Sequence, residues 1–127
     1  MLKDRNSSAI VAVRDIDRAR TFYEETLGLT LEQSDTEGGV LGFRTGDTRL
    51  TVYKSDFAGT NKANAVSWDM DGDLVETVQA LRTKGVVFEH YPDMGMTLNG
   101  DIHEIGGMKL VWFKDPDGNI LHLIEGM

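Results

Sequence analysis

The residue of this sequence best suited to chemistry lies near the C-terminal end, where one histidine interrupts an apolar run. His122 lies between two pairs of aliphatic residues. An imidazole titrates close to neutral pH, so His122 can contact a ligand or transfer a proton. A third interpretation is structural: a partly buried ring that hydrogen-bonds to Thr51 or Ser8.

A turn before this run decides which side chains share a face with His122. Pro116 fixes its own φ, and Gly118 can adopt a positive φ, so residues 115–118 are typical of a tight turn between two strands. Alternation along arms that pair closely around this turn predicts two faces. One face carries Val111, Phe113, Ile120, His122 and Ile124, and the other carries Leu110, Trp112, Leu121 and Leu123. Trp68 and Trp112 are expected to face helices in the core.

Another predicted strand, residues 49–54, places Arg49, Thr51 and Tyr53 on one face. Together with Phe43 on the preceding strand, these residues predict a ligand cleft. Tyr53 and Phe43 would stack on a flat ligand, and Arg49 or Thr51 would anchor its polar groups. Ordinary cross-strand packing with a solvated Arg49 remains an open alternative.

His103 and Glu104 belong to Asp93–Gly106, a segment that contains Met94 and Met96. Adjacent residues of an extended chain point in opposite directions, so His103 and Glu104 are not expected to chelate one ion. The first interpretation of this segment is an exposed loop or a dimer contact, and the alternative is a lid over the cleft, which the adaptable methionines allow. The sequence has no glycine-rich phosphate loop and no serine nucleophile elbow.

The composition indicates one acidic globular domain, residues 1–127, with a hydrophobic share of 40%. The chain is long enough to form a core without disulfides or metals. Its formal net charge of −8 argues against a nucleic-acid partner, which requires clustered basic residues. Cysteine is absent, which excludes disulfides and thiolate zinc sites. No window has transmembrane length and the first residues are polar, so we expect a cytoplasmic protein without a membrane partner.

Two copies of one pattern are expected to position the candidate residues. In residues 8–55, a strand over 8–13 leads through the helix cap Asp15 to a helix over 16–27 that ends at Gly28, and strands follow over 29–34, 40–44 and 49–54. Residues 64–125 repeat the pattern with strands over 65–70, 86–91, 109–114 and 120–125 and an irregular insert over 92–106. The repeat predicts an α+β fold, in which two βαβββ modules form a cupped, half-barrel mixed sheet with helices outside.

The run from Asp15 to Leu29 (Asp-Ile-Asp-Arg-Ala-Arg-Thr-Phe-Tyr-Glu-Glu-Thr-Leu-Gly-Leu), the two modules and the Asp-Pro-Asp-Gly-Asn turn resemble the vicinal oxygen chelate superfamily. This group includes glyoxalase I, extradiol dioxygenases, fosfomycin-resistance enzymes and bleomycin-resistance proteins. The resemblance covers roughly residues 8–125. It implies paired βαβββ modules and a homodimer whose ligand sites use residues from one or both chains.

The resemblance also implies where a metal would be held. The positions that supply metal ligands in metal-using members fall on Ser8, Thr51, Ala65 and His122. A neutral hydroxyl is a poor donor to such metals, and alanine offers none. We therefore expect no metal and no other cofactor. This departure argues against glyoxalase and dioxygenase chemistry, which uses a metal to polarise substrate oxygens.

The predicted function is therefore metal-free binding of a small molecule, such as an antibiotic or an apolar or aromatic metabolite. The expected cleft is lined by Ser8, Phe43, Arg49, Thr51, Tyr53, Phe113 and His122. The alternative is a lyase, isomerase or dioxygenase-type enzyme with a rearranged site around His122 that also uses His103 or Glu104. A third option is a protein-interaction module with a vestigial cleft.

Overall fold

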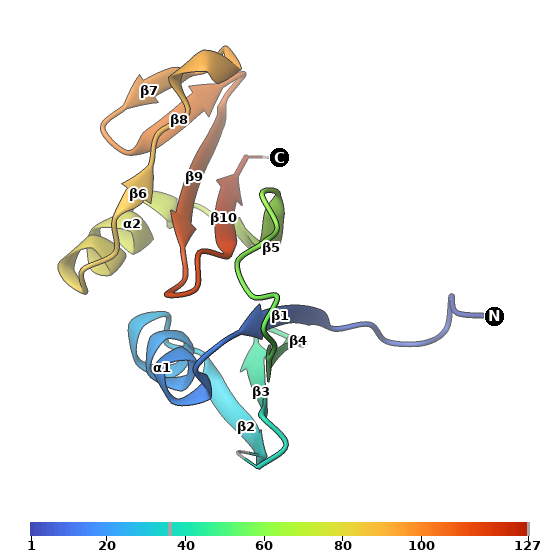
Figure 1. Ribbon diagram of the computed structural model, residues 1–127. Helices are drawn as coiled ribbons and strands as arrows, with labels where there is room; N and C mark the ends of the chain where they lie inside the picture. The colour runs from blue at the N-terminus through green and yellow to red at the C-terminus, as the bar shows by residue number, and fades with distance from the viewer. Residues whose placement is uncertain (36, 127) are drawn as a thin grey trace. The chain divides into compact units, whose positions relative to one another are not determined.

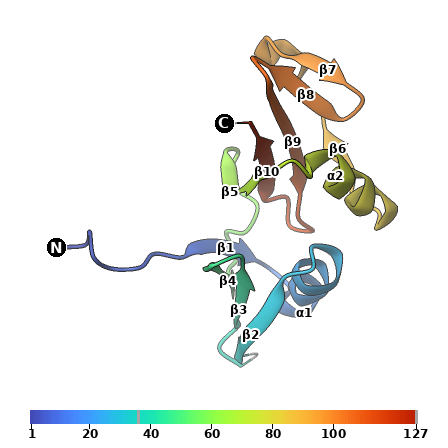
Figure 2. The ribbon, with the colours of Figure 1, turned by 180° about the vertical axis from the view of Figure 1, so that it is seen from behind.

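The computed structural model describes residues 1–35 and 37–126, and the chain divides into two compact units, Met1–Gly59 and Thr60–Met127. Each unit has a mixed β-sheet and one α-helix (Figures 1 and 2). The predicted α+β class is confirmed by these two mixed sheets. In the described part of the chain, no helix has the length and apolarity needed to cross a membrane.

The first unit arranges its strands in the order β1-β4-β3-β2, with β1 parallel to β4 and the other pairs antiparallel. Its elements are β1 (Ala9–Val13), α1 (Ile16–Arg20), the π-helical turn η1 (Thr21–Thr26), β2 (Thr30–Asp35), β3 (Val40–Thr45) and β4 (Thr48–Lys54). These are the strand, helix and three strands that the hydrophobic pattern predicts.

The helical segment of the first unit begins and ends where the sequence predicts. Asp15 caps α1, because its carboxylate accepts hydrogen bonds from the backbone N–H groups of Asp17 and Arg18 at 3.0 and 3.1 Å. The last turn is wider than an α-helix, and the Leu27 N–H donates to the Phe22 carbonyl, five residues earlier. Gly28 then has a φ of 75°, which lets the chain leave the helix in a left-handed conformation.

One face of the first sheet packs against this helix. Phe43 is fully buried there, and its ring centroid lies 5.9 Å from that of Tyr23 in η1. The other members of this core are Val11, Val13, Ala19, Leu41, Leu50 and Val52, each at most 2% exposed. Alternation therefore leaves Thr51 and Tyr53 on the opposite face of the sheet.

The second unit arranges its sheet as β5-β10-β9-β8-β7, with β6 also paired to β9. Strand β5 is parallel to β10, and the other pairs are antiparallel. Its elements are β5 (Asn64–Met70), α2 (Leu74–Thr83), β6 (Phe88–Glu89), the 3-10 turn η2 (Pro92–Met94), β7 (Thr97–Asn99), β8 (Ile102–Ile105), β9 (Met108–Lys114) and β10 (Ile120–Glu125).

The insert over 92–106 is more ordered than predicted. It holds the η2 turn and the β7–β8 hairpin (Figure 1). Both β6 and β8 pair with β9. In the first unit, the corresponding strand β3 has a single partner on that side, β2. The extra residues therefore interrupt a single strand and split it into β6 and β8. A pattern of Gly, Met and Asp did not reveal the hairpin, because its strands are only three and four residues long.

The second helix starts differently from the first. Asp73 lies at the N-cap position of α2 but makes no side-chain cap. The Leu74 N–H instead donates to a carboxylate oxygen of Glu125 in β10, at 3.0 Å. Because Glu125 reaches α2 in this way, the face of β10 that carries Glu125, Leu121 and Leu123 is the face that packs on the helix.

The turn between β9 and β10 contains one residue more than predicted. The Asp115 carboxylate accepts hydrogen bonds from the N–H groups of Asp117 and Asn119, both at 2.9 Å, and from the Asn119 side-chain amide at 2.8 Å. The pair of residues next to the turn is consequently Lys114 and Ile120. Because side chains alternate along a strand, a shift by one residue moves every side chain of one arm to the other face.

Candidate functional site

The first unit contributes a pair of hydroxyl groups on the sheet face away from its helix. Ser8 Oγ lies 3.2 Å from Thr51 Oγ1, and Ser8 also donates a hydrogen bond to the Arg49 carbonyl oxygen at 2.9 Å. A hydroxyl has one hydrogen to donate. When Ser8 donates to Arg49, Thr51 therefore donates to Ser8, and both hydroxyl hydrogens are used.

Two arginines lie beside this pair and share one carboxylate. Arg49 Nη2 and Arg44 Nη2 each lie 3.3 Å from a different oxygen of Glu32. They border an open hollow of about 620 Å³. The residues that line it all have polar side chains: Asn6, Ser7, Ser8, Glu32, Arg44, Asp47, Thr48 and Arg49. The two positive and two negative side chains of this lining balance, so the hollow does not select strongly for one sign of charge.

Phe43 does not line this face, and the prediction that it stacks on a ligand with Tyr53 is wrong. Phe43 pairs with Leu50, whereas Tyr53 pairs with Val40, because the hairpin between β3 and β4 turns directly from Thr45 to Thr48. Tyr53 remains on the same face as Thr51 and is 37% exposed. Phe43 is fully buried against the helix and serves the core.

Phe113 of the second unit also does not lie on the face of His122, where it was predicted. The longer turn pairs Phe113 with Leu121 and Trp112 with His122. Phe113 is 1% exposed and makes an edge contact with Phe88, at a ring separation of 5.7 Å. Trp112, which was expected to face α2, lies instead on the face of His122.

His122 is held by two neighbours. Its Nδ1 lies 2.9 Å from the Val111 carbonyl oxygen, and its ring is stacked on the Trp112 indole with centroids 4.6 Å apart and planes 19° apart. A carbonyl only accepts hydrogen bonds, so Nδ1 carries the hydrogen and Nε2 the lone pair in the neutral ring. Burial lowers the pKa of His122, and the Val111 contact opposes that shift. The imidazole is therefore neutral at pH 7.

The hydrogen-bond partner of His122 Nδ1 is Val111, which belongs to the same unit. The register relates the two units at this point: Thr51 pairs with Gly42 in β3, as His122 pairs with Trp112 in β9. The first unit thus has no side chain where the second has an indole. The Trp112 Nε1–H donates to Asn64 Oδ1 at 3.1 Å, which fixes the indole over β10.

His103 extends this aromatic cluster and is fully buried. Its ring meets Trp112 edge-on at 4.9 Å, and its Nε2 accepts the Tyr91 backbone N–H at 2.9 Å. Burial lowers the pKa of His103. Glu104, the next residue, points to the other side of β8 and lines a separate hollow of about 500 Å³ beside Gly106–Lys109. The expectation that these two residues would not act together on one ion agrees with this alternation.

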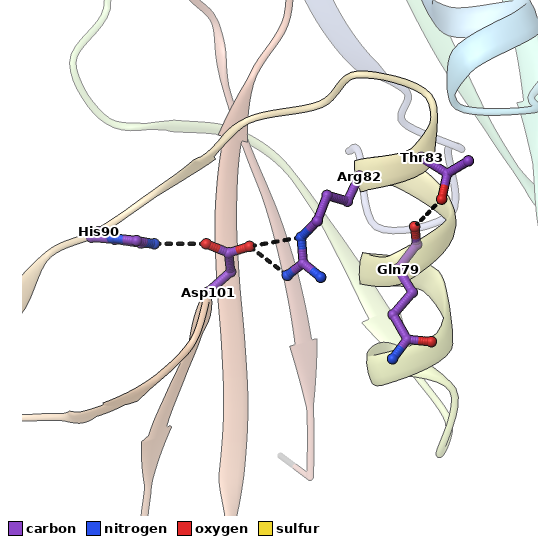
Figure 3. Close-up of polar contacts among 5 residues, drawn as sticks. All are labelled: Gln79, Arg82, Thr83, His90 and Asp101. Atoms are coloured by element: carbon purple, nitrogen blue, oxygen red, sulfur yellow. Dashed lines mark hydrogen bonds and ion pairs between the residues drawn. The ribbon is translucent and has the colours of Figure 1, made fainter.

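The β7–β8 turn is tied to two other elements by one carboxylate. Asp101 accepts hydrogen bonds from Arg82 Nε of α2 at 3.1 Å and lies 2.7 Å from His90 Nε2 (Figure 3). The His90 contact, followed by the Arg82 contact, lowers the pKa of Asp101. Sequence reasoning missed this clamp, because three residues separated by 8 and 11 positions in an irregular region show no periodic pattern.

The donor set does not suit a divalent metal. Of the four positions that the family resemblance indicates, the first unit offers the two hydroxyls that bond to each other. In the second unit, Ala65 offers no donor and is the extra residue of a bulge in β5, between the pairs Ile120–Asn64 and Leu121–Val66. Only His122 is a usual ligand. Across residues 1–35 and 37–126, no three His, Cys, Asp or Glu side chains are grouped so as to hold an ion.

Two βαβββ units, each with polar groups on the sheet face away from its helix, define a protein of the glyoxalase type. The model of the Glyoxalase/Bleomycin resistance protein/Dioxygenase superfamily matches residues 7–123, and the chain belongs to this family. The resemblance seen in the sequence is thereby confirmed. No curated protein matches the chain.

Solved structures with the same fold include proteins of different kinds. Lactoylglutathione lyase from Agrobacterium tumefaciens has a TM-score of 0.74 and 18% identity, over 99% of this chain and 96% of that one. The fosfomycin resistance protein FosX from Listeria monocytogenes has a TM-score of 0.74 and 12% identity, over 100% and 96%. An integron cassette protein from the mobile metagenome of the Halifax Harbour sewage outfall has a TM-score of 0.73 and 19% identity, over 97% and 99%. At these identities the likeness is one of fold.

Proposed function

We propose that the chain is a small-molecule binding protein of the glyoxalase and bleomycin-resistance type that works without a bound metal. The observation that carries this proposal is the Ser8–Thr51 pair, whose oxygens lie 3.2 Å apart at two family ligand positions. Two neutral hydroxyls have little to offer a cation, which prefers imidazole or carboxylate donors. Their oxygens keep lone pairs that can accept hydrogen bonds from polar groups of an organic ligand.

The ligand contacts that we propose differ between the units. The first unit offers Ser8, Arg49, Thr51 and Tyr53 on the face away from its helix, and the second offers His122 with Trp112. Phe43 and Phe113 are omitted, because both are core residues. Family relatives named for lactoylglutathione and fosfomycin give two ligand classes for a first screen.

The first test is a metal titration of the purified protein. We expect calorimetry with Ni²⁺, Mn²⁺, Zn²⁺ and Fe²⁺ to show no tight, stoichiometric binding, because one imidazole is a weak site. His90→Ala is the matched control, since His90 lies beside a carboxylate at the surface and would account for any weak surface binding. A single ion bound tightly by the wild type and by His90→Ala, but not by His122→Ala, would show the proposal to be wrong.

The ligand itself is sought by thermal shift. A compound that binds only the folded protein raises its melting temperature, by an amount set by its concentration relative to Kd. Thr51→Val is the informative variant, because it keeps the β-branched shape and removes only the hydroxyl. Poor occupancy by every compound of a broad screen would instead favour the protein-interaction module.

The enzyme alternative has one observation in its favour. The His122 ring is fixed by Val111 and Trp112, with Nε2 carrying a lone pair, which is the state of an oriented general base. Turnover of a glutathione hemithioacetal or a catechol with added metal, lost in His122→Ala, would establish it.

A further inference from the structure

The three histidines of the chain use their Nε2 atoms differently. Nε2 of His103 accepts the Tyr91 N–H, and Nε2 of His90 contacts Asp101. Nε2 of His122 has no hydrogen-bond partner within residues 1–35 and 37–126. It is not one of the side-chain atoms that are buried without a partner in these residues, although the residue as a whole is only 6% exposed. Nε2 is therefore open to solvent, and a donor group of a ligand can reach it.

The polarity of this atom is fixed by the structure. Nδ1 donates to the Val111 carbonyl, so Nε2 can only accept. The Trp112 Nε1–H, the one donor of the stacked indole, is already used by Asn64. The stack therefore presents a hydrogen-bond acceptor and no free donor.

The neighbouring strand β5 adds one hydroxyl and one carboxylate to this face. In β5, Ser67 pairs with His122 and Asp69 pairs with Ile124, so all three polar side chains share one face of the sheet. Ser67 and Asp69 are exposed. An anionic group brought to this face would meet the His122 lone pair and the Asp69 carboxylate, both of which repel it. A hydroxyl or N–H group would find acceptors.

We propose that the His122–Trp112 stack recognises an aromatic ligand through a hydroxyl or N–H that it donates to His122 Nε2. The proposal rests on the proposed small-molecule function and narrows its ligand class to aromatic hydrogen-bond donors, with anions disfavoured. The aromatic preference rests on the rings grouped on this face of the sheet, where Trp112 stacks on His122 and packs edge-on against His103 and Tyr91.

The test uses three probes with one ring: phenol, which donates, anisole, which cannot, and benzoate, which is anionic. Binding is followed on the whole chain by NMR with ¹⁵N-labelled histidine. We expect phenol, and not anisole, to shift the His122 Nε2 resonance, while His103 Nε2, which is held by Tyr91, does not move. Phenol should bind about 3- to 10-fold more tightly than anisole, the range of one net hydrogen bond, and benzoate should not bind.

His122→Asn is the variant that tests the acceptor at Nε2. The Asn amide nitrogen is as many bonds from the backbone as His Nδ1, so it can still donate to Val111, whereas the acceptor at Nε2 is gone. The preference for phenol over anisole should disappear in this variant and persist in His90→Asn. If His122→Asn does not fold, the inference is judged from the shift of the His122 Nε2 resonance in the wild type, with phenol compared with anisole.

The outcomes separate this inference from the proposed function. Equal binding of phenol and anisole without a shift at His122, or a phenol preference that survives His122→Asn, overturns the inference and leaves small-molecule binding standing. Preferred binding of benzoate also overturns it. If none of the probes and no compound of the broad screen binds, the proposed function fails, and the inference fails with it.

Discussion

Single residues decide the polarity of the candidate site. His122 and Thr51 occupy corresponding positions of the two sheets, but one is stacked under an indole and the other lies beside Gly42. The residue on the neighbouring strand, Trp112 or Gly42, therefore determines how open each face is, rather than His122 or Thr51 itself. This difference follows from cross-strand register and so is invisible to a comparison of sequence positions alone.

His103 predicts an acid-sensitive stability of the second unit. Its buried Nε2 accepts the Tyr91 N–H, a bond that protonation would remove while burying a charge. The folded-state pKa is thus lowered below that of the unfolded chain, about 6.5. Below that pH the unfolded state binds more protons, so stability is present above about pH 6.5 and falls as the pH falls through the folded pKa.

We expect the melting temperature to decrease between pH 7.5 and pH 5.5, and the decrease to be smaller in His103→Gln. A glutamine oxygen can accept from Tyr91 and does not titrate. Some pH dependence should remain, because burial also lowers the pKa of His122. Differential scanning calorimetry across this range measures how the melting temperature changes with pH in the wild type and in His103→Gln. Identical slopes for the wild type and His103→Gln would rule out His103 as the source.

At the scale of elements, the helices and most strands could be predicted, whereas the β7–β8 hairpin and the register of the last hairpin could not. Asp15 and Gly28 mark the first helix correctly, and the strand positions follow the hydrophobic pattern. Phe113 lies on the helix face because the turn after it contains one residue more than predicted, and that length is set by hydrogen bonds such as those of Asp115 with Asn119. Turn length does not explain Phe43, because the predicted strands 40–44 and 49–54 already give the observed pair Arg44–Arg49. That register places Phe43 beside Leu50 and away from Thr51.

The Asp101 clamp predicts how the insert is held. Asp101 connects the β7–β8 turn to Arg82 of α2 and to His90 after β6. Its side chain is partly exposed, so Asp101→Asn should lower the unfolding free energy by only about 1 kcal/mol at pH 7. The lowered pKa means that this contribution is present above the unfolded value of 3.8 and is lost as the pH falls through the folded value.

Urea unfolding at pH 7 and at pH 3 measures this effect, and hydrogen exchange should show faster opening of β7 and β8 in Asp101→Asn. Asp93→Asn is the matched control, because Asp93 is an exposed carboxylate of the same insert. Equal stability and exchange in the two variants would contradict a clamp.

At the scale of the whole molecule, apolar side chains are exposed on the first-unit face that carries Thr51. Ile10 is 60% exposed, Val40 38% and Tyr53 37%, and the register places them on neighbouring positions of β1, β3 and β4. Contiguous exposed apolar surface usually marks a contact with a ligand or another protein. The family resemblance implies a homodimer, so we propose that a second copy covers part of this face.

Sedimentation equilibrium is expected to give about twice the chain mass of 14.1 kDa at micromolar concentrations. Ile10→Lys should shift the equilibrium toward the monomer, because a charged ammonium in place of an aliphatic side chain would have to be desolvated on association. Val87→Lys is the control, since Val87 is 79% exposed and lies outside this face, between α2 and β6. A wild type of 14.1 kDa at every concentration, or equal effects of the two substitutions, would contradict the dimer and leave the apolar face to the ligand alone.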